Sequence, residues 1–454
     1  MTSRLRTTDV PGTRDEYTGV DFNLGFHVRH YDLDLNYRVA PNRLDARARL
    51  LIVTWRELAS LTLDLVSTLP VRRVDARGSA GRRVTVTRFS QRGGKVRIHF
   101  ADAVPVDTEF TLEIRYGGQP QPRRTAWGEI GWEELRNGLL VASQPNGAPT
   151  WFPCDDTPDE KATYDLRVTA DNPYVVVCPG DLVSRERHGS TSTWHYRTRH
   201  RMATYLATVQ IGEYTRLDLG DRCAAWVPPS LAAAAARELG DQAEMLQYFE
   251  GLFGRYPFPA YTVVVTEDDL DIPLEAQGLS IFGANHIREA GRWERLIAHE
   301  LAHQWFGNSL GLAQWNDIWL NEGFACYCEW LWFEHRGVPA ASSAYQHYAG
   351  LRAQPADLLL ADPGPHAMFD DRVYKRGALT VHALRVLLGD DAFFHALRSY
   401  VAAGRHGIVE PIDLRRELYA VADAGYHAVG RAAVDDVLQR WVYATDLPDF
   451  PAAS

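Results

Sequence analysis

The chain has 454 residues, which exceeds the usual size of a single hydrophobic core and predicts two or three domains. Its 46% hydrophobic content and 13 tryptophans are typical of packed globular cores and exclude a disordered protein. The formal charge, 48 basic minus 58 acidic residues, is −10 and is spread along the chain, so it gives no support to nucleic-acid binding.

The same composition argues against membrane insertion and secretion. No run of about 18 apolar residues occurs, which excludes an obvious transmembrane helix. Residues 1–17 are polar and lack the apolar centre of a secretory signal. The cysteines are too scattered for a disulfide framework, and a pair at 326 and 328 is better explained as buried thiols than as a metal clip. A cytoplasmic protein fits these features best.

The first half of the chain predicts β-structure. From about His27 onward, apolar residues recur at every second position in segments separated by Gly, Pro and Asn. These segments run over 31–39, 44–52, 61–65, 84–86, 96–100 and 110–116. Period-two alternation predicts half-buried antiparallel strands. We therefore expect residues 1–215 to form one all-β domain.

One segment of this half, from Ser143 to Leu166, is predicted to be irregular in its middle. It contains four prolines together with a glycine and an asparagine, which prevent regular structure. Long irregular segments on rigid scaffolds often carry function. An ordinary crossover between two sheets explains the same composition.

After Tyr214 the pattern changes to helical spacing. Helices are predicted over 230–254, 373–389, 392–403, 412–424 and 432–445, and a short buried strand over 261–266. Strands followed by helices are typical of an α+β protein built from successive domains. We expect residues 216–454 to form a second, mainly helical domain.

Residues 299–303 read H-E-L-A-H and predict a metal site. On a helix, His299 and His303 lie one turn apart on the same face and can bind one ion. Glu300 is rotated by about 100° and can instead act as general base on a water bound to that ion. Glu322 follows after eighteen residues on the next predicted helix and is the natural third ligand. This set predicts one Zn²⁺ per chain, and it argues against a mere pair of core histidines.

Two further acidic residues are candidates for orienting a ligand histidine. Glu329 lies two helical turns after Glu322 on the same face, from which it can accept a hydrogen bond from the far ring nitrogen. An exposed helix glutamate is nearly as good an explanation. Asp317 is a weaker candidate for the same role.

The motif HELAHQWFGN, followed after eighteen residues by NEGFA, resembles the gluzincin zinc aminopeptidases, the family of aminopeptidase N and leukotriene hydrolase. The resemblance covers most of the chain and implies a saddle-like β-domain followed by a thermolysin-like catalytic domain. By this match His299, His303 and Glu322 are zinc ligands and Glu300 is the base. The chain ends where larger members carry a further helical domain, which implies a short form with a more open cleft.

Four further expectations follow from the resemblance. Residues 374–377 are similar to the family's Y-x-K-G segment, with arginine in place of lysine, which makes Tyr374 the hydrogen-bond donor to the oxyanion. The family's G-A-M-E-N segment keeps only its glutamate, Glu275, which is implied to bind the substrate's α-amino group. Gln144 falls where the family places a second ligand of that group. Residues 279–282 are implied to form the edge strand on the substrate side.

These features predict an aminopeptidase, in which zinc-dependent hydrolysis removes residues from peptides that have a free N-terminus. The same centre is also compatible with another zinc hydrolase activity, such as that of an endopeptidase or an epoxide hydrolase. A non-catalytic binding module that retains the fold is the third alternative. The sequence carries no signal for a particular oligomeric state.

Overall fold

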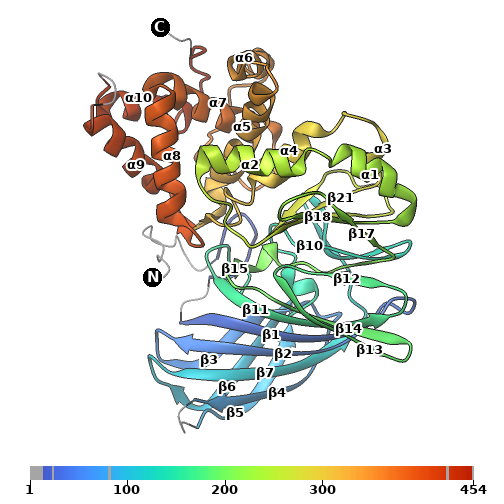
Figure 1. Cartoon of the computed structure of the whole chain (residues 1–454). Coiled ribbons are helices and arrows are strands. Elements are labelled where there is room, and N and C mark those ends of the chain that lie inside the picture. Colours follow the sequence, from blue (N-terminus) through green and yellow to red (C-terminus); the bar gives the residue numbers. More distant parts are fainter. Residues whose placement is uncertain (1–13, 23–24, 80–82, 426–428, 452–454) are drawn as a thin grey trace.

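A computed structural model describes residues 14–22, 25–79, 83–425 and 429–451 (Figure 1). Residues 1–13, which include most of the polar N-terminus discussed above, lie outside the described residues. In the described part of the chain, a β-rich half precedes a mainly helical half, so the prediction of an α+β protein is confirmed. Figure 1 shows the helices above and the largest sheet below.

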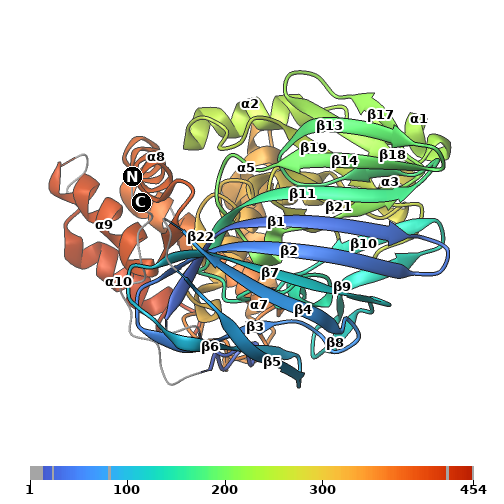
Figure 2. The same cartoon turned by 90° about the horizontal axis from the view of Figure 1, so that it is seen from below.

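The strands of the first half form three sheets. The largest has eight strands in the order β13-β14-β11-β1-β2-β7-β4, with β15 paired to β11, and the others are β12-β16-β10-β9-β8 and β3-β6-β5. Figure 2 shows the strands of the large sheet side by side on the underside of the molecule. The bounds are β1 Phe26–Arg38, β2 Arg43–Thr54, β3 Leu58–Asp64, β4 Val71–Gly78, β5 Val86–Arg92, β6 Lys95–Val104, β7 Glu109–Gly118, β8 Arg123–Thr125, β9 Gly128–Leu135, β10 Gly138–Ala142, β11 Lys161–Asp171, β12 Val175–Val177, β13 Asp181–His188, β14 Thr191–Arg197, β15 Met202–Ala203 and β16 Gln210–Gly212.

Strand β1 shows why the alternating pattern folds in this way. Tyr31, Leu33 and Leu35 are buried in the core. Asp32 points to the other face, where its carboxylate accepts a hydrogen bond from Arg49 of β2 at 2.9 Å. One feature differs from the antiparallel prediction, because β1 runs parallel to β11. The chain between the two strands runs through all three sheets, and such a long connection permits a parallel pair.

The second half contains a five-stranded sheet of order β17-β18-β19-β21-β20 and the described α-helices. Its strands are β17 Thr215–Asp218, β18 Cys223–Val227, β19 Tyr261–Val265, β20 Leu274–Ala276 and β21 Leu279–Phe282, with a separate pair β22 Gly311–Leu312 and β23 Ile408–Val409. The helices are α1 Ala232–Glu238, α2 Gln242–Phe253, α3 Asn285–Arg288, α4 Glu294–Ala302, α5 Trp319–His335, α6 Ala340–Leu351, α7 Asp371–Leu388, α8 Asp390–Gly404, α9 Pro411–Asp423 and α10 Arg431–Trp441.

The chain changes from one group of sheets to the other between Gly212, where β16 ends, and Thr215, where β17 begins. We propose the domain boundary here, with domains 1–215 and 216–454. No helix in the described part of the chain has both the length and the apolar character needed to cross a membrane. The five cysteines are all buried and unpaired.

Asp156, in the irregular segment between β10 and β11, makes stability depend on pH. One carboxyl oxygen accepts a hydrogen bond from Thr204 at 2.7 Å, and the other is buried without a partner. Burial and the nearby Asp64 raise its pKa to about 8. Because an unfolded aspartate has a pKa of about 4, the folded state binds this proton more tightly, and stability is lost as the pH rises from about 4 to about 8.

We therefore expect Asp156→Asn to melt at a higher temperature than the wild type at pH 8. The difference in free energy of unfolding between the variant and the wild type should shrink toward pH 5, by up to about 1.4 kcal/mol per pH unit. Thermal unfolding at the two pH values measures it. As a control, Asp45→Asn removes an exposed carboxylate of β2 and should change stability by less than about 0.5 kcal/mol. A difference between Asp156→Asn and the wild type that stays constant with pH would contradict the assignment.

Candidate metal centre

Helix α4 and the turn after it place the two histidines. His299 lies in the last turn of α4, and His303 is the C-cap residue with helical angles of φ −55° and ψ −23°. The two rings are 4.7 Å apart between centroids, and both are buried. Gly307 ends the turn with φ +116°, a left-handed conformation that favours glycine, and a Cβ there would lie only 3.3 Å from His303 Nδ1.

Glu322, in the first turn of α5, completes a group of three metal-ligand atoms. One carboxylate oxygen of Glu322 lies 3.4 Å from Nε2 of His299 and 3.4 Å from Nε2 of His303. All three ligand atoms lie within 4.8 Å of one another. Burial alone would raise the pKa of Glu322, but the two neighbouring imidazoles bring it down to about 2. The carboxylate is therefore ionised, as a ligand must be.

Each histidine is oriented through its Nδ1 atom. His299 Nδ1 lies 2.8 Å from a carboxylate oxygen of Glu329, and His303 Nδ1 lies 3.0 Å from the backbone oxygen of Phe306. Both contacts need Nδ1–H as the donor, so the Nε2 atom of each ring, which lies 3.4 Å from Glu322, is the atom left to bind a metal ion. Asp317 has no hydrogen bond to either histidine, and its carboxyl is buried with Glu410 as its electrostatic neighbour.

The donor set fits zinc. Two imidazole nitrogens and one carboxylate oxygen are the ligands found in catalytic zinc sites, and three protein ligands leave a tetrahedral ion one position for water or substrate. The role of the Phe306 carbonyl was missed in the sequence, because a backbone acceptor carries no residue signature. The glycine that shapes its turn, at position 307, was the available signal.

Glu300 lies beside the ligands without joining them. It is 4% exposed, and its Oε2 atom is buried with no hydrogen-bond partner. Without a metal ion, burial raises the pKa of its carboxyl to about 8, and the positive charge of a bound metal ion would lower this pKa and favour the carboxylate. A carboxyl oxygen of Glu300 also belongs to a second close group, with Glu275 and His303, whose ligand atoms lie within 4.8 Å of one another. The carboxylate that the motif assigns as base therefore lies between the metal ligands and Glu275.

Gln144 and Glu275 are separated by 131 residues and meet at the same centre. The Gln144 side-chain amide donates a hydrogen bond of 2.7 Å to Glu275. Glu275 lies on β20, which is the edge strand of its sheet, and β21 lies one place inward. The expectation that residues 279–282 form the edge strand is therefore wrong. The short β20 hairpin adds one more strand outside β21, and that strand carries the carboxylate.

Tyr374 reaches the centre because α5 and α7 pack closely. Gly323 and Gly377 face each other at the crossing, and a Cβ on Gly323 would lie 2.7 Å from the Cα of Gly377. Two glycines thus let the backbones approach: Gly323 immediately follows Glu322, and Gly377 is the last residue of the 374–377 segment. The Tyr374 ring lies over His299, with centroids 6.0 Å apart and planes at 21°. A side chain on either glycine would separate the two motifs.

Arg376 stands where the aminopeptidase family usually has lysine, and its side chain binds backbone carbonyl groups. Its guanidinium donates to backbone carbonyls at the C-terminal end of α10 and nearby, and α10 ends at Trp441 instead of continuing to 445 as predicted. The acceptors are the oxygens of Leu358, Arg440, Trp441, Ala444, Thr445 and Asp446. A planar guanidinium offers five N–H donors, whereas a lysine offers three, so arginine suits this arrangement.

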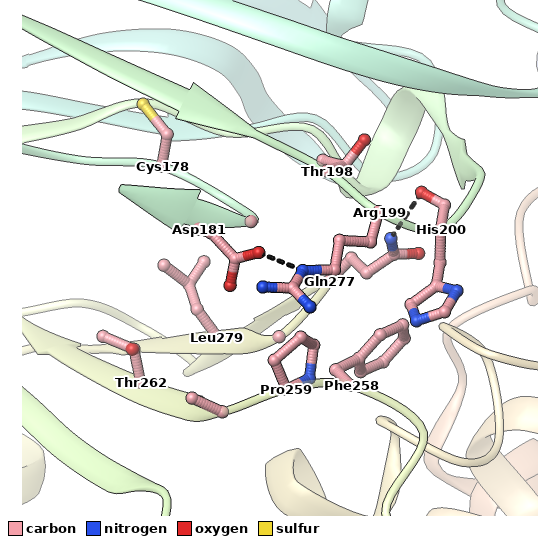
Figure 3. Close-up of a pocket in the computed structure, with 13 residues that line it drawn as sticks. Cys178, Asp181, Thr198, Arg199, His200, Phe258, Pro259, Thr262, Gln277 and Leu279 are labelled. Atoms are coloured by element: carbon pink, nitrogen blue, oxygen red, sulfur yellow. Dashed lines mark hydrogen bonds and ion pairs between the residues drawn. The ribbon is translucent and has the colours of Figure 1, made fainter. Parts of the chain in front are cut away.

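A separate pocket of about 60 Å³ lies between the two halves of the molecule (Figure 3). Arg199 and Asp181 form an ion pair on one side, and Phe258 and Pro259 line the other. Gln277, in the turn between β20 and β21, also lines it and donates to the backbone oxygen of His200. None of the proposed ligand or catalytic residues lines this pocket.

Comparisons with known proteins agree with this architecture. The Peptidase M1 N-terminal domain matches residues 27–206, and the Peptidase family M1 domain matches residues 237–441. Aminopeptidase Q of Acinonyx jubatus is 26% identical over 92% of this chain, and aminopeptidase N of Mus musculus is 26% identical over 82%. The chain spans 48% and 42% of the lengths of these two relatives.

Among solved structures, a mutant M1 zinc metallopeptidase of Deinococcus radiodurans bound to a Tyr-Ser-Ala substrate matches with a TM-score of 0.86 and 28% identity. The match covers 97% of this chain and 99% of that one. The fold and the metal-ligand set are similar to those of the M1 zinc metallopeptidases. The chain belongs to peptidase family M1, which confirms the resemblance indicated by its HELAHQWFGN and NEGFA motifs.

Proposed function

We propose that the protein is an aminopeptidase that hydrolyses the N-terminal peptide bond of peptides. The observation that carries this proposal is the position of Glu275, whose carboxylate lies within 4.8 Å of ligand atoms of Glu300 and His303. Only two covalent bonds separate a peptide's α-amino nitrogen from its first carbonyl carbon. An ammonium bound at Glu275 and Gln144 therefore brings the first peptide bond, and no later one, to the metal.

In this proposal His299, His303 and Glu322 hold one Zn²⁺. When bound, zinc lowers the pKa of a coordinated water from about 15.7 to near 7 and polarises the scissile carbonyl. Glu300 accepts the water's proton at its unpartnered Oε2 and later delivers it to the leaving amine. Tyr374 donates its hydroxyl hydrogen to the oxygen that becomes negative during the reaction.

The amine anchor distinguishes this function from the alternatives. An endopeptidase binds a peptide on both sides of the cleaved bond. A carboxylate as close to the metal position as that of Glu275 would occupy the space that the N-terminal part of such a peptide needs. The epoxide group on which an epoxide hydrolase acts carries no ammonium for Glu275 and Gln144 to bind. A binding module gives no reason for a carboxyl such as that of Glu300 to be buried next to metal ligands without a partner of its own.

We expect a peptide with a free N-terminus to be cleaved at least about 10²-fold faster, in kcat/KM, than its N-acetylated counterpart. Acetylation removes the charge that the half-buried Glu275 carboxylate would bind, and losing a hydrogen bond to a charged group costs about 3 kcal/mol. Paired assays of the two peptides measure the ratio, and Glu275→Gln should narrow it. Equal cleavage by the unmodified enzyme would rule out the amine anchor. If both peptides were cleaved equally and a chelator abolished both reactions, the protein would be a zinc hydrolase of another specificity.

A cytoplasmic location is part of the proposal. The cysteines of the chain are buried thiols, which suits a reducing compartment. The net charge of −10 favours small peptides over nucleic acid as partners. Fractionation of the producing cells tests the location, and recovery with exported proteins would contradict it.

A further inference from the structure

Glu329 has a buried carboxylate that the proposed mechanism does not use. It lies on α5, two turns after Glu322, and is 3% exposed. One of its oxygens lies 2.8 Å from His299 Nδ1, on the side of the ring opposite the metal position. We infer that Glu329 is a positioning residue that fixes the tautomer and orientation of His299 and strengthens its binding to zinc. The inference rests on the proposed metal site but not on the choice of substrate.

The two ligand histidines differ in what holds them. His303 donates to the neutral carbonyl of Phe306 at 3.0 Å, whereas His299 donates to a carboxylate at 2.8 Å. A hydrogen bond to an ionised acceptor is stronger than one to a neutral acceptor. It also increases the electron density on the imidazole, so that Nε2 becomes a better ligand. His299 is therefore the histidine whose affinity for metal is tuned by a charge.

The surroundings of Glu329 keep its carboxylate in this position. Arg295, one turn before His299 on α4, approaches its oxygens at 3.4 and 3.5 Å. On the other side, Lys375 of α7 contacts the Cys326 sulfur at 3.4 Å, one turn before Glu329 on α5. Cations from two neighbouring helices thus flank the carboxylate, and Lys375 is the residue next to Tyr374.

A purely structural ion pair with Arg295 is the competing explanation. That pair is long, and the Arg295 side chain is 47% exposed, so its contribution to stability is expected to be small. The contact with His299 is shorter, and both partners are buried. The geometry therefore favours His299 as the partner for which the carboxylate is placed.

Zinc affinity of the purified enzyme, measured by competition with a chelator in the absence of substrate, tests the inference. We expect Glu329→Gln to weaken zinc binding about 10- to 100-fold, because the side chain keeps an acceptor but loses its charge. The matched control is Glu334→Gln on the same helix, where the carboxylate pairs with Arg385 at 2.8 Å and does not contact either histidine. This variant should bind zinc as the wild type does.

A second readout separates positioning from folding. In the cobalt-substituted enzyme, Glu329→Gln should alter the visible absorption spectrum, whereas Glu334→Gln should not. Glu329→Asp retains the charge but withdraws it from Nδ1 by one methylene, so its zinc affinity should lie between those of Glu329→Gln and the wild type. It is also the variant to use if Glu329→Gln does not fold. An affinity within twofold of the wild type in either folded variant, even with a lower melting temperature, would overturn the inference.

Discussion

Glu300→Gln is expected to lower kcat/KM by about 10⁴-fold while zinc remains bound. Glutamine has nearly the same shape as glutamate, but its amide cannot accept the proton of an attacking water, and general-base catalysis contributes up to about 10⁴-fold. The zinc ligands His299, His303 and Glu322 are unchanged. In the structure Glu300 has an unpartnered oxygen beside these ligands, so its loss should affect chemistry and not metal binding.

Two measurements on the same preparation check this expectation. Turnover of an aminoacyl reporter substrate should collapse, and metal analysis should still find one zinc per chain. Glu294→Gln is the matched control, because Glu294 lies in the first turn of α4, about one and a half turns before His299, and accepts a hydrogen bond from Trp332. It should retain activity. Substantial turnover by zinc-loaded Glu300→Gln would refute the assignment of the base.

Tyr374→Phe is expected to lower kcat by about 10²- to 10³-fold with little change in KM. The hydroxyl is proposed to donate to an oxygen that becomes negative only in the transition state, and removing one such donor typically has an effect of this size. Burial and the carboxylates of the centre keep the pKa of Tyr374 above its usual value, so the phenol remains a donor at neutral pH. The ring, which stacks over His299, is retained.

Steady-state kinetics with a reporter peptide measure the two constants separately. Tyr348→Phe on α6 is the control, because it makes the same change at a buried tyrosine on a helix that packs against α7. A variant Tyr374→Phe that raises KM while kcat is preserved would place the hydroxyl on the bound substrate instead of the transition state. That result would leave zinc as the main source of oxyanion stabilisation.

Local sequence determined the parts of this protein that depend on short-range geometry. The spacing of His299 and His303 places both on one helical face whatever surrounds them, because the helix repeats every 3.6 residues. Alternation along β1 likewise determined which residues face the core. Helices α7, α8 and α9 lie within a few residues of their predicted bounds, and α10 ends earlier, where Arg376 binds its last carbonyls. The single helix predicted over 230–254 is divided into α1 and α2, and α6 was not predicted.

The positions of Gln144 and Glu275 came from the family resemblance, but their contact depends on tertiary structure. They are 131 residues apart, and no periodicity connects a loop after β10 with an edge strand in another sheet. The order of β20 and β21 in that sheet was predicted wrongly for the same reason. Neighbouring strands are chosen by packing across the whole domain, not by the pattern within either strand.

Glu329 shows most directly what the sequence by itself could determine. Its position two turns after Glu322 put it on the correct face, so the sequence reduced its role to two alternatives, a histidine partner or an exposed helix carboxylate. Only the packing of α5 against α4 decided between them, because burial and the 2.8 Å contact with His299 arise where the two helices meet. The motifs determined the chemistry of the centre, and the tertiary fold determined which distant side chains complete it.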